Sequence, residues 1–157
     1  MKLLWKLRVN ALSLSLKNCW DRISENYQQK SGIPTDDVYW GDFVATESQL
    51  KILGDVRRKR ILEIGCGGAQ NSIALSKWGA KTLGVDLSRK QILYGRRLMR
   101  NESVQVSLLV CNMERLEENM LHPLDKEKIW KIREARQQHR IMNEVPYWIV
   151  FKARKTA

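Results

Sequence analysis

The stretch RILEIGCGGAQNSIALSKWGAKTLGVDLS, residues 60–88, decides the fold of this chain. Its first five residues, 60–64, place apolar side chains on both sides of a single acid, which is typical of a short buried strand. Three glycines follow within four positions, at Gly65, Gly67 and Gly68. Because clustered glycines mark tight turns, the stretch predicts a strand that ends in a glycine loop.

Beyond the glycine loop, the pattern changes to that of a helix and then to that of a second strand. Asn71 and Ser72 are residue types that cap helices, and an apolar stripe continues from there until Gly79. Residues 81–86 are again strand-like and end in the carboxylate of Asp86. The order of strand, glycine turn, helix, strand and acid is half of a nucleotide-binding βαβ fold.

The spacing between the loop and the second acid favours an adenosine-containing ligand. Glycine has no Cβ, so the loop backbone can approach a ligand closely, and the helix that follows offers unpaired N–H groups. Asp86 lies 21 positions after Gly65. This is close to the roughly 20-residue spacing at which an acid after the second strand binds ribose hydroxyls.

Two common classes of phosphate-binding loop fit this stretch poorly. A P-loop needs a lysine after its glycines, but Gly68 is followed by alanine and Gln70. A dinucleotide fingerprint counted from Gly65 needs glycine or alanine where Gln70 stands, so NAD is disfavoured. Glu63, at the end of the first strand, would repel a pyrophosphate and attract a cationic ligand.

Residues 63–69, EIGCGGA, resemble the first motif of the Rossmann-like S-adenosylmethionine-dependent methyltransferases. That motif is an acid followed by x-Gly-x-Gly-x-Gly, and Ala69 replaces its last glycine here. The resemblance, which extends over about residues 20–116, implies that Glu63 helps to hold the methionine end of the cofactor S-adenosylmethionine and that Asp86 binds its ribose. It implies the following cofactor-binding residues: Tyr27, Glu63, Gly65, Cys66, Gly67, Asp86, Leu87, Asn112 and Met113.

The next elements bring a third position to the same edge of the sheet. Ser88 is expected to cap a helix that reaches Arg100 and buries one apolar face, made of Ile92, Leu93, Tyr94 and Leu98. Residues 104–110 alternate apolar and polar side chains and predict a third strand. By resemblance, the adenine contact after that strand, usually an acid, falls on Asn112, beside Met113.

We expect a single domain over residues 1–157 with an α/β fold, a Rossmann-like open and mainly parallel sheet with flanking helices. Its parts are an N-terminal helical cap at 1–56, a cofactor-binding half at 57–116, and a charged helix and terminal strand at 117–157. The sequence offers about four strands where the family has seven, because only 145–152 is strand-like after residue 116. The sheet is therefore expected to be shortened.

The N-terminal part reads as helical. Residues 1–16 space leucines at helical intervals with interleaved cations, and Trp20, Ile23 and Tyr27 share one helical face before a break at 31–34. No apolar run reaches the roughly 18 residues needed to cross a bilayer. By resemblance, this segment leans over the cofactor with Tyr27 as a contact, and the alternative is that these aromatic residues belong to the core.

The composition fits a cytoplasmic protein without a metal site. The 157 residues carry a formal net charge of +11 and a pI near 9.8, which would attract phosphate-rich partners or anionic lipid. The three cysteines, Cys19, Cys66 and Cys111, form no CxxC pair and leave one unpaired under any bridging scheme. Cys66 has no nearby histidine to activate it, so we interpret it as a small filler of the loop rather than a nucleophile.

Three functions remain open at this stage. The first is a methyltransferase that uses S-adenosylmethionine and acts on an unidentified acceptor, either a small molecule or RNA. The second is a non-catalytic S-adenosylmethionine-binding remnant or accessory subunit, which the missing strands favour. The third is a basic RNA-binding module, which the charge of +11 favours. The short sheet also predicts a homo-oligomer or a partner chain that completes it, and the sequence nominates no catalytic base.

Overall fold

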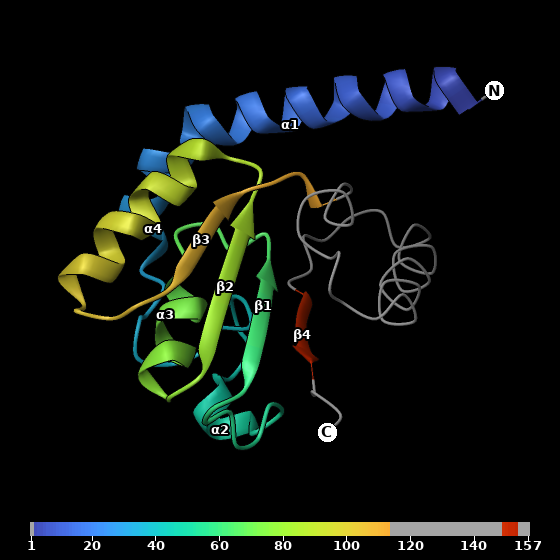
Figure 1. Cartoon of the computed structure of the whole chain (residues 1–157). Helices are drawn as coiled ribbons and strands as arrows, with labels where there is room; N and C mark the ends of the chain where they lie inside the picture. The colour runs from blue at the N-terminus through green and yellow to red at the C-terminus, as the bar shows by residue number, and fades with distance from the viewer. Residues whose placement is uncertain (1, 114–148, 154–157) are drawn as a thin grey trace.

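The computed structural model describes residues 2–113 and 149–153. In chain order its elements are α1 (Lys2–Ser31), α2 (Glu47–Leu50), β1 (Arg60–Ile64), α3 (Gln70–Lys77), β2 (Lys81–Asp86), α4 (Arg89–Asn101), β3 (Ser107–Val110) and β4 (Ile149–Ala153). Figure 1 shows the strands side by side, with α1 across the end toward which β1, β2 and β3 point. None of the helices in these two ranges combines the length and the apolar content that a bilayer crossing requires.

The sheet has the strand order β3-β2-β1-β4. β1, β2 and β3 are parallel, and the register pairs Ile64 with Val85 and Asp86 with Val110. β4 runs antiparallel to β1 and pairs Ile149 with Ile64. The prediction of a Rossmann-like, mainly parallel sheet of about four strands is thus confirmed, and the terminal strand lies against β1. The charged helix predicted before that strand lies outside the described residues.

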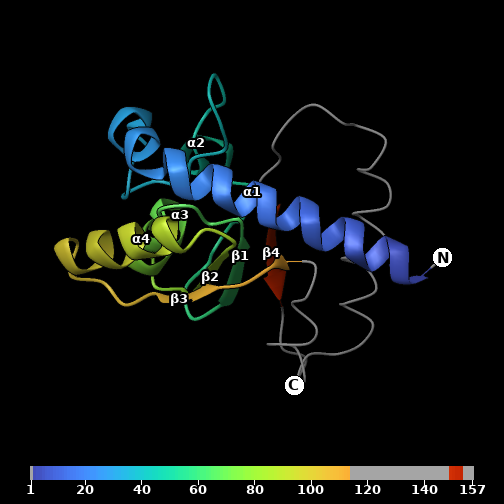
Figure 2. The ribbon, with the colours of Figure 1, turned by 90° about the horizontal axis from the view of Figure 1, so that it is seen from above.

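Alternation along β1 separates two apolar layers. Ile61 packs with Ala74 and Leu75 of α3 in one buried cluster, whereas Leu62 and Ile64 pack in another, around Val85 of β2. Successive side chains of a strand point to opposite faces, which explains the two clusters. Seen from above, α3 and α4 lie together on one side of the sheet (Figure 2), so the helices that flank the glycine loop also cover the face that carries Ile61.

The helix α3 begins differently from the prediction. Its N-cap is Ala69, with φ +65° and no side-chain cap, and the predicted cap residues Asn71 and Ser72 lie inside the helix. The amide of Asn71 exchanges hydrogen bonds with the backbone of Tyr39 at 2.8 and 3.1 Å, and Ser72 donates to Glu63. Both side chains are therefore committed to tertiary contacts, and the prediction that one of them caps α3 is wrong.

The helix α4 has the predicted N-cap residue, but its buried face differs from the predicted one. Ser88 caps it by accepting a hydrogen bond from the Gln91 backbone N–H at 3.2 Å. Leu93, which was expected to be buried, is 45% exposed, whereas Gln91 is 2% exposed. Gln91 is buried because its side chain accepts a hydrogen bond from Gln28 of α1 at 2.6 Å. The third strand is also shorter than predicted, because β3 begins only at Ser107.

The helix α1 is continuous from Lys2 to Ser31 and stops before Gly32, whose φ of +57° suits the residue that follows a helix. The predicted apolar face is largely outward, since Trp20 is 37% and Ile23 is 41% exposed. Among the α1 side chains whose burial is described, those of residues 14–31, the buried ones are instead polar, with Ser24 at 2% and Gln28 at 6% exposure. Polar contacts therefore join this part of α1 to α3 and α4.

Candidate functional site

The glycine loop is attached to the end of β2 by its own backbone. The N–H groups of Gly65 and Cys66 both donate to the carbonyl of Val85, at 2.8 and 3.0 Å. The next N–H, of Gly67, donates to Oδ2 of Asp86 at 2.9 Å. Gly65 and Gly67 have φ values of +72° and +51°, in the left-handed region that glycine adopts without strain. The loop is thereby folded over the carboxyl ends of β1 and β2.

Asp86 is held at both oxygens of its carboxylate. Oδ1 accepts from the Ser88 backbone N–H at 2.7 Å, while Oδ2 accepts from Gly67. Burial raises the pKa of Asp86, and these backbone N–H groups oppose that shift. A carboxylate has about four lone-pair sites, so Asp86 can accept further bonds from a ligand while it keeps both backbone contacts.

Glu63 is an acid in the protein interior. Its side chain lies toward α3, is 2% exposed, and accepts a hydrogen bond from the Ser72 hydroxyl at 2.5 Å. Burial raises the pKa of Glu63 to about 7, and the negative charge of Asp86 adds to the shift. A cation placed near these two acids would favour the ionised form of both. This pair of acids therefore suits a ligand that carries positive charge.

The loop is open at one glycine and covered at another. Apart from Gly65 itself and its two neighbours in sequence, no described atom lies within 4 Å of the position that a Cβ on Gly65 would take. At Gly68, the same position meets the side-chain amides of Gln28 and Gln70 at 2.8 Å. Among the described residues, the space beside Gly65 is therefore open to a ligand, whereas Gln28 of α1 already occupies the space over Gly68. The residues at this edge fit an adenosine ligand that carries a cationic group.

The remaining predicted residues are distributed around this edge. Cys66 is buried, and burial, with the charges of Glu63 and Asp86, raises the pKa of its thiol well above the ordinary value, which favours the neutral form. Leu87 is half-buried directly after Asp86. Asn112 is half-buried, and Met113, beside it, is 48% exposed. The register of β3 and the bond from the Cys111 N–H to the Asp86 carbonyl, at 2.9 Å, bring this segment next to the end of β2.

Tyr27 lies on α1 and is half-buried. Its ring meets that of Trp20 edge-on, with 5.5 Å between the centroids. Burial raises the pKa of Tyr27, and the charge of Asp42 adds to the shift. The described hydrogen bonds from α1 to the glycine-loop region come from its neighbour Gln28, which accepts from Gln70 Nε2 at 2.5 Å.

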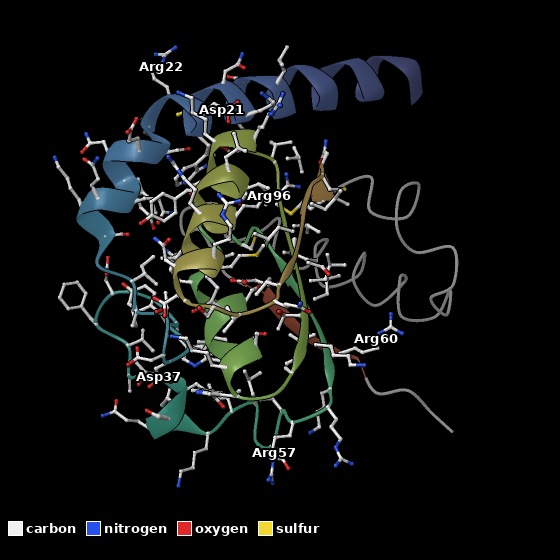
Figure 3. All side chains as sticks on the ribbon, turned by 60° about the vertical axis from the view of Figure 1, so that its left-hand side comes forward. Asp21, Arg22, Asp37, Arg57, Arg60 and Arg96 are labelled. Carbon is white, nitrogen blue, oxygen red and sulfur yellow. The ribbon has the colours of Figure 1, made fainter. Side chains whose placement is uncertain are left out.

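A polar seam joins α1 to the site, and sequence reasoning missed it. Gln28 donates to Gln91 Oε1 at 2.6 Å, and Asp21 accepts from the Ser88 hydroxyl at 2.6 Å. Figure 3 shows Asp21 directed toward α4, whereas its neighbour Arg22 is directed outward. Asp21, Ser24 and Gln28 are spaced three and four positions apart, which places them on one helical face. That spacing was the available signal.

Comparison with known proteins finds similarity to methyltransferases over part of the chain. Residues 61–125 match the family model of a methyltransferase domain. The match begins inside β1 and includes the glycine loop, Asp86 and Asn112. Over these residues the chain is similar to a methyltransferase domain, which agrees with the resemblance seen in the motif at 63–69.

Individual relatives match only part of the chain. A Geobacillus sp. (strain WCH70) protein whose name places it among the methyltransferases is 33% identical over 50% of this chain and 31% of its own length. The ubiquinone biosynthesis O-methyltransferase of Nitrosococcus oceani is 33% identical over 43% of this chain and 28% of its own. The chain therefore matches less than a third of the length of these relatives.

Among solved structures, an S-adenosylmethionine-dependent methyltransferase from Clostridium acetobutylicum superimposes with a TM-score of 0.41 and 17% identity, covering 60% of this chain and 37% of that one. The PH0226 protein from Pyrococcus horikoshii gives a TM-score of 0.39 and 24% identity, covering 42% and 31% respectively.

Proposed function

We propose that this chain binds S-adenosylmethionine where β1, β2 and β3 end, as the cofactor-binding half of a methyltransferase. The observation that carries the proposal is the Asp86 carboxylate, which the N–H groups of Gly67 and Ser88 hold in place beside the open position at Gly65. A carboxylate that is fixed in this way can accept hydrogen bonds from two ribose hydroxyls without first being ordered by the ligand.

Each residue has a distinct role in this proposal. Asp86 accepts from the ribose hydroxyls, with Leu87 beside it. Asn112 and Met113 lie along the adenine, where the Asn112 amide can both donate and accept. Gly65, Cys66 and Gly67 line the cofactor with their backbone, and Glu63 provides negative charge near the methionine end. Tyr27 of α1 closes the site from above. The cationic methionine end then lies near the two acids whose pKa values burial raises.

The cofactor supplies a methyl group on a positively charged sulfur, which an acceptor displaces in line. The chain contributes by positioning the cofactor, because such a displacement depends mainly on holding the acceptor and the methyl group in alignment. The acceptor is a small molecule or RNA in this proposal, and we assign no catalytic base.

A second function, S-adenosylmethionine binding without turnover, is favoured by the order of the strands. The position beside β1 is taken by the antiparallel β4 rather than by a further parallel strand. On this alternative the chain serves as an accessory subunit, or works with a partner that supplies the acceptor side.

Calorimetric titration tests the proposal. S-adenosylmethionine and S-adenosylhomocysteine should both bind, since both carry the adenosine that Asp86 suits, and NAD should not. Radiolabelled methyl transfer to a panel of small molecules and RNA then separates a methyltransferase from the non-catalytic alternative. Equal binding of all three ligands, or of none, would contradict the proposed site.

A further inference from the structure

The outer face of α4 carries a stripe of arginines. Arg89, Arg96, Arg97 and Arg100, together with Leu93, fall within about one quarter of the helix circumference at 3.6 residues per turn. All five side chains are exposed, and the last four line an open hollow on the surface. Figure 3 labels Arg96 on this helix. From Arg89 to Arg100 the stripe is about 16 Å long at 1.5 Å per residue.

The positive charge of this stripe is not neutralised within the described part of the chain. The ion pairs there are Lys17–Asp21, Arg57–Asp55 and Lys77–Glu102, and no arginine of α4 takes part. The helix itself, RKQILYGRRLMRN, contains no acid. Glu102, the first acid after it, is held by Lys77 at 2.7 Å and by the Thr35 hydroxyl at 2.9 Å. Among the residues that the structure describes, the stripe therefore presents concentrated charge with no acidic partner.

Two of the guanidinium groups are positioned by the fold. Arg96 donates through Nη2 to the Leu108 carbonyl at 3.3 Å. Arg97 lies over the ring of Tyr94, with 5.9 Å from Cζ to the ring centroid. An arginine has five N–H donors, so each of these contacts leaves donors for a ligand while it limits the motion of the side chain. Partly ordered guanidinium groups lose less conformational freedom when they bind an anion.

We propose that the arginine stripe of α4 binds the phosphate backbone of a nucleic acid. Phosphates follow one another at about 3.4 Å along the axis of each strand of a duplex, so a stripe of about 16 Å spans several of them. Guanidinium forks match phosphate oxygens. A membrane surface fits less well, because helices that lie on bilayers insert an apolar face, and Leu93 is the one apolar side chain within this stripe.

The test is fluorescence anisotropy with a labelled 20-nucleotide RNA, used as a single strand and as a duplex, at several salt concentrations. The triple variant R96Q/R97Q/R100Q should bind at least tenfold more weakly than the unmodified chain. On the single strand, the slope of log affinity against log salt should become shallower by about 2, because three phosphate contacts are lost at about 0.7 each. R96K/R97K/R100K, which keeps the charge, should retain most of the affinity.

The matched control is R22Q/K30Q/K81Q, which removes three exposed cations from α1 and β2. It lowers the net charge by the same amount and should change the affinity less than twofold. Circular dichroism and a thermal melt confirm that both triple variants fold. The proposal is overturned if the two glutamine variants bind equally, if the unmodified chain binds no RNA, or if only phosphatidylserine vesicles discriminate between them.

Discussion

The carboxylate of Asp21 in α1 accepts a hydrogen bond at 2.6 Å from the hydroxyl of Ser88, the residue that caps α4. The same oxygen accepts from the Lys90 backbone N–H at 3.2 Å. The first turn of α4 contains no acid of its own and begins with two cations, although a helix N-terminus favours negative charge. Asp21 supplies that charge from another helix, directly beside the backbone that holds Asp86.

Replacing Asp21 with asparagine should lower the free energy of unfolding by about 1 kcal/mol, because a charged cap contact becomes a neutral one. Burial raises the pKa of Asp21, but hydrogen bonds from Lys17, Ser88 and Lys90 outweigh it and lower the pKa to about 2. A lowered pKa stabilises the fold above the ordinary value, near 3.8, and this contribution is lost as pH falls toward 2.

Urea unfolding of Asp21→Asn at pH 7 and pH 3 tests this role. The difference from the unmodified chain should shrink at the lower pH. The exposed Glu25 on the same helix provides a matched control, since Glu25→Gln should have little effect at either pH. Equal losses in the two variants would show that Asp21 does not support α4.

Glu63→Gln should stabilise the fold at alkaline pH. Between pH 4.5 and 7 the unfolded chain loses the Glu63 proton while the folded chain keeps it, so stability falls as pH rises through this window. The cost of ionising Glu63 at pH 8 is on the order of 3 kcal/mol, and the glutamine avoids it. The unfolding free energies of the variant and the unmodified chain should diverge between pH 4.5 and about 7 and then stay apart up to pH 8. A constant difference over the whole range would contradict the raised pKa.

The affinity for a cationic cofactor should depend on the same residue. If S-adenosylmethionine binds near ionised Glu63, its affinity should rise with pH up to about 7, because binding favours loss of the proton. Glu63→Gln should bind more weakly and with a flatter pH profile. Titrations at pH 5.5, 6.5 and 7.5 measure both, and the same pH dependence in the variant would remove Glu63 from the site.

Gly95→Ala should destabilise the chain although alanine favours helices. A Cβ there would lie 3.0 Å from the Gly68 carbonyl oxygen and 3.1 Å from the Ala69 Cβ. The gain in helix propensity is about 1 kcal/mol, and overpacking costs about 1–3 kcal/mol, so a net loss of about 1 kcal/mol is expected. Thermal melts measure it. A higher melting temperature would mean that the glycine loop yields to α4 without cost.

Self-association should occur through the edge strand β3 of the sheet. Among the described strands, β3 ends the sheet on one side, with Leu109 at 37% and Val110 at 40% exposure. Apolar edge strands promote pairing between chains. Sedimentation velocity should show concentration-dependent association that Leu109→Lys reduces. The matched control, Leu93→Lys on α4, should leave it unchanged, and a monomer at all concentrations would contradict the prediction.

Local sequence patterns were sufficient to predict the order of the helices and strands around the glycine loop. The glycine loop, the Ser88 cap and the strand before Asp86 each depend on residues close in sequence, so their patterns predicted β1, β2 and α4 with nearly the observed bounds. Parallel strands end at one edge, so the sequence could predict that β1, β2 and β3 end side by side, as their register shows. The sequence could not specify which polar groups would pair across the fold.

Those tertiary pairings explain the errors. Asn71 and Ser72 are typical caps, but Tyr39 and Glu63 offer them partners that local reasoning does not see. Similarly, Gln28 is buried because its side chain forms hydrogen bonds with Gln70 and Gln91, although glutamine is a residue type that is mostly exposed. Gln28 also lies over Gly68 of the glycine loop, whereas the role of Tyr27 stays a prediction.

The most direct test of the central claim is the affinity for S-adenosylhomocysteine of Asp86→Asn compared with Asp37→Asn. Asp37 is a matched control, because its carboxylate also accepts from two backbone N–H groups, those of Val38 and Ser48, at 2.8 and 3.1 Å. In Figure 3, Asp37 lies near α3, away from the carboxyl ends of the strands. Calorimetry should give an affinity at least tenfold weaker for Asp86→Asn, since charge-assisted hydrogen bonds contribute about 1.5–3 kcal/mol, and an unchanged affinity for Asp37→Asn. Equal affinities in the two folded variants would contradict a cofactor site at Asp86.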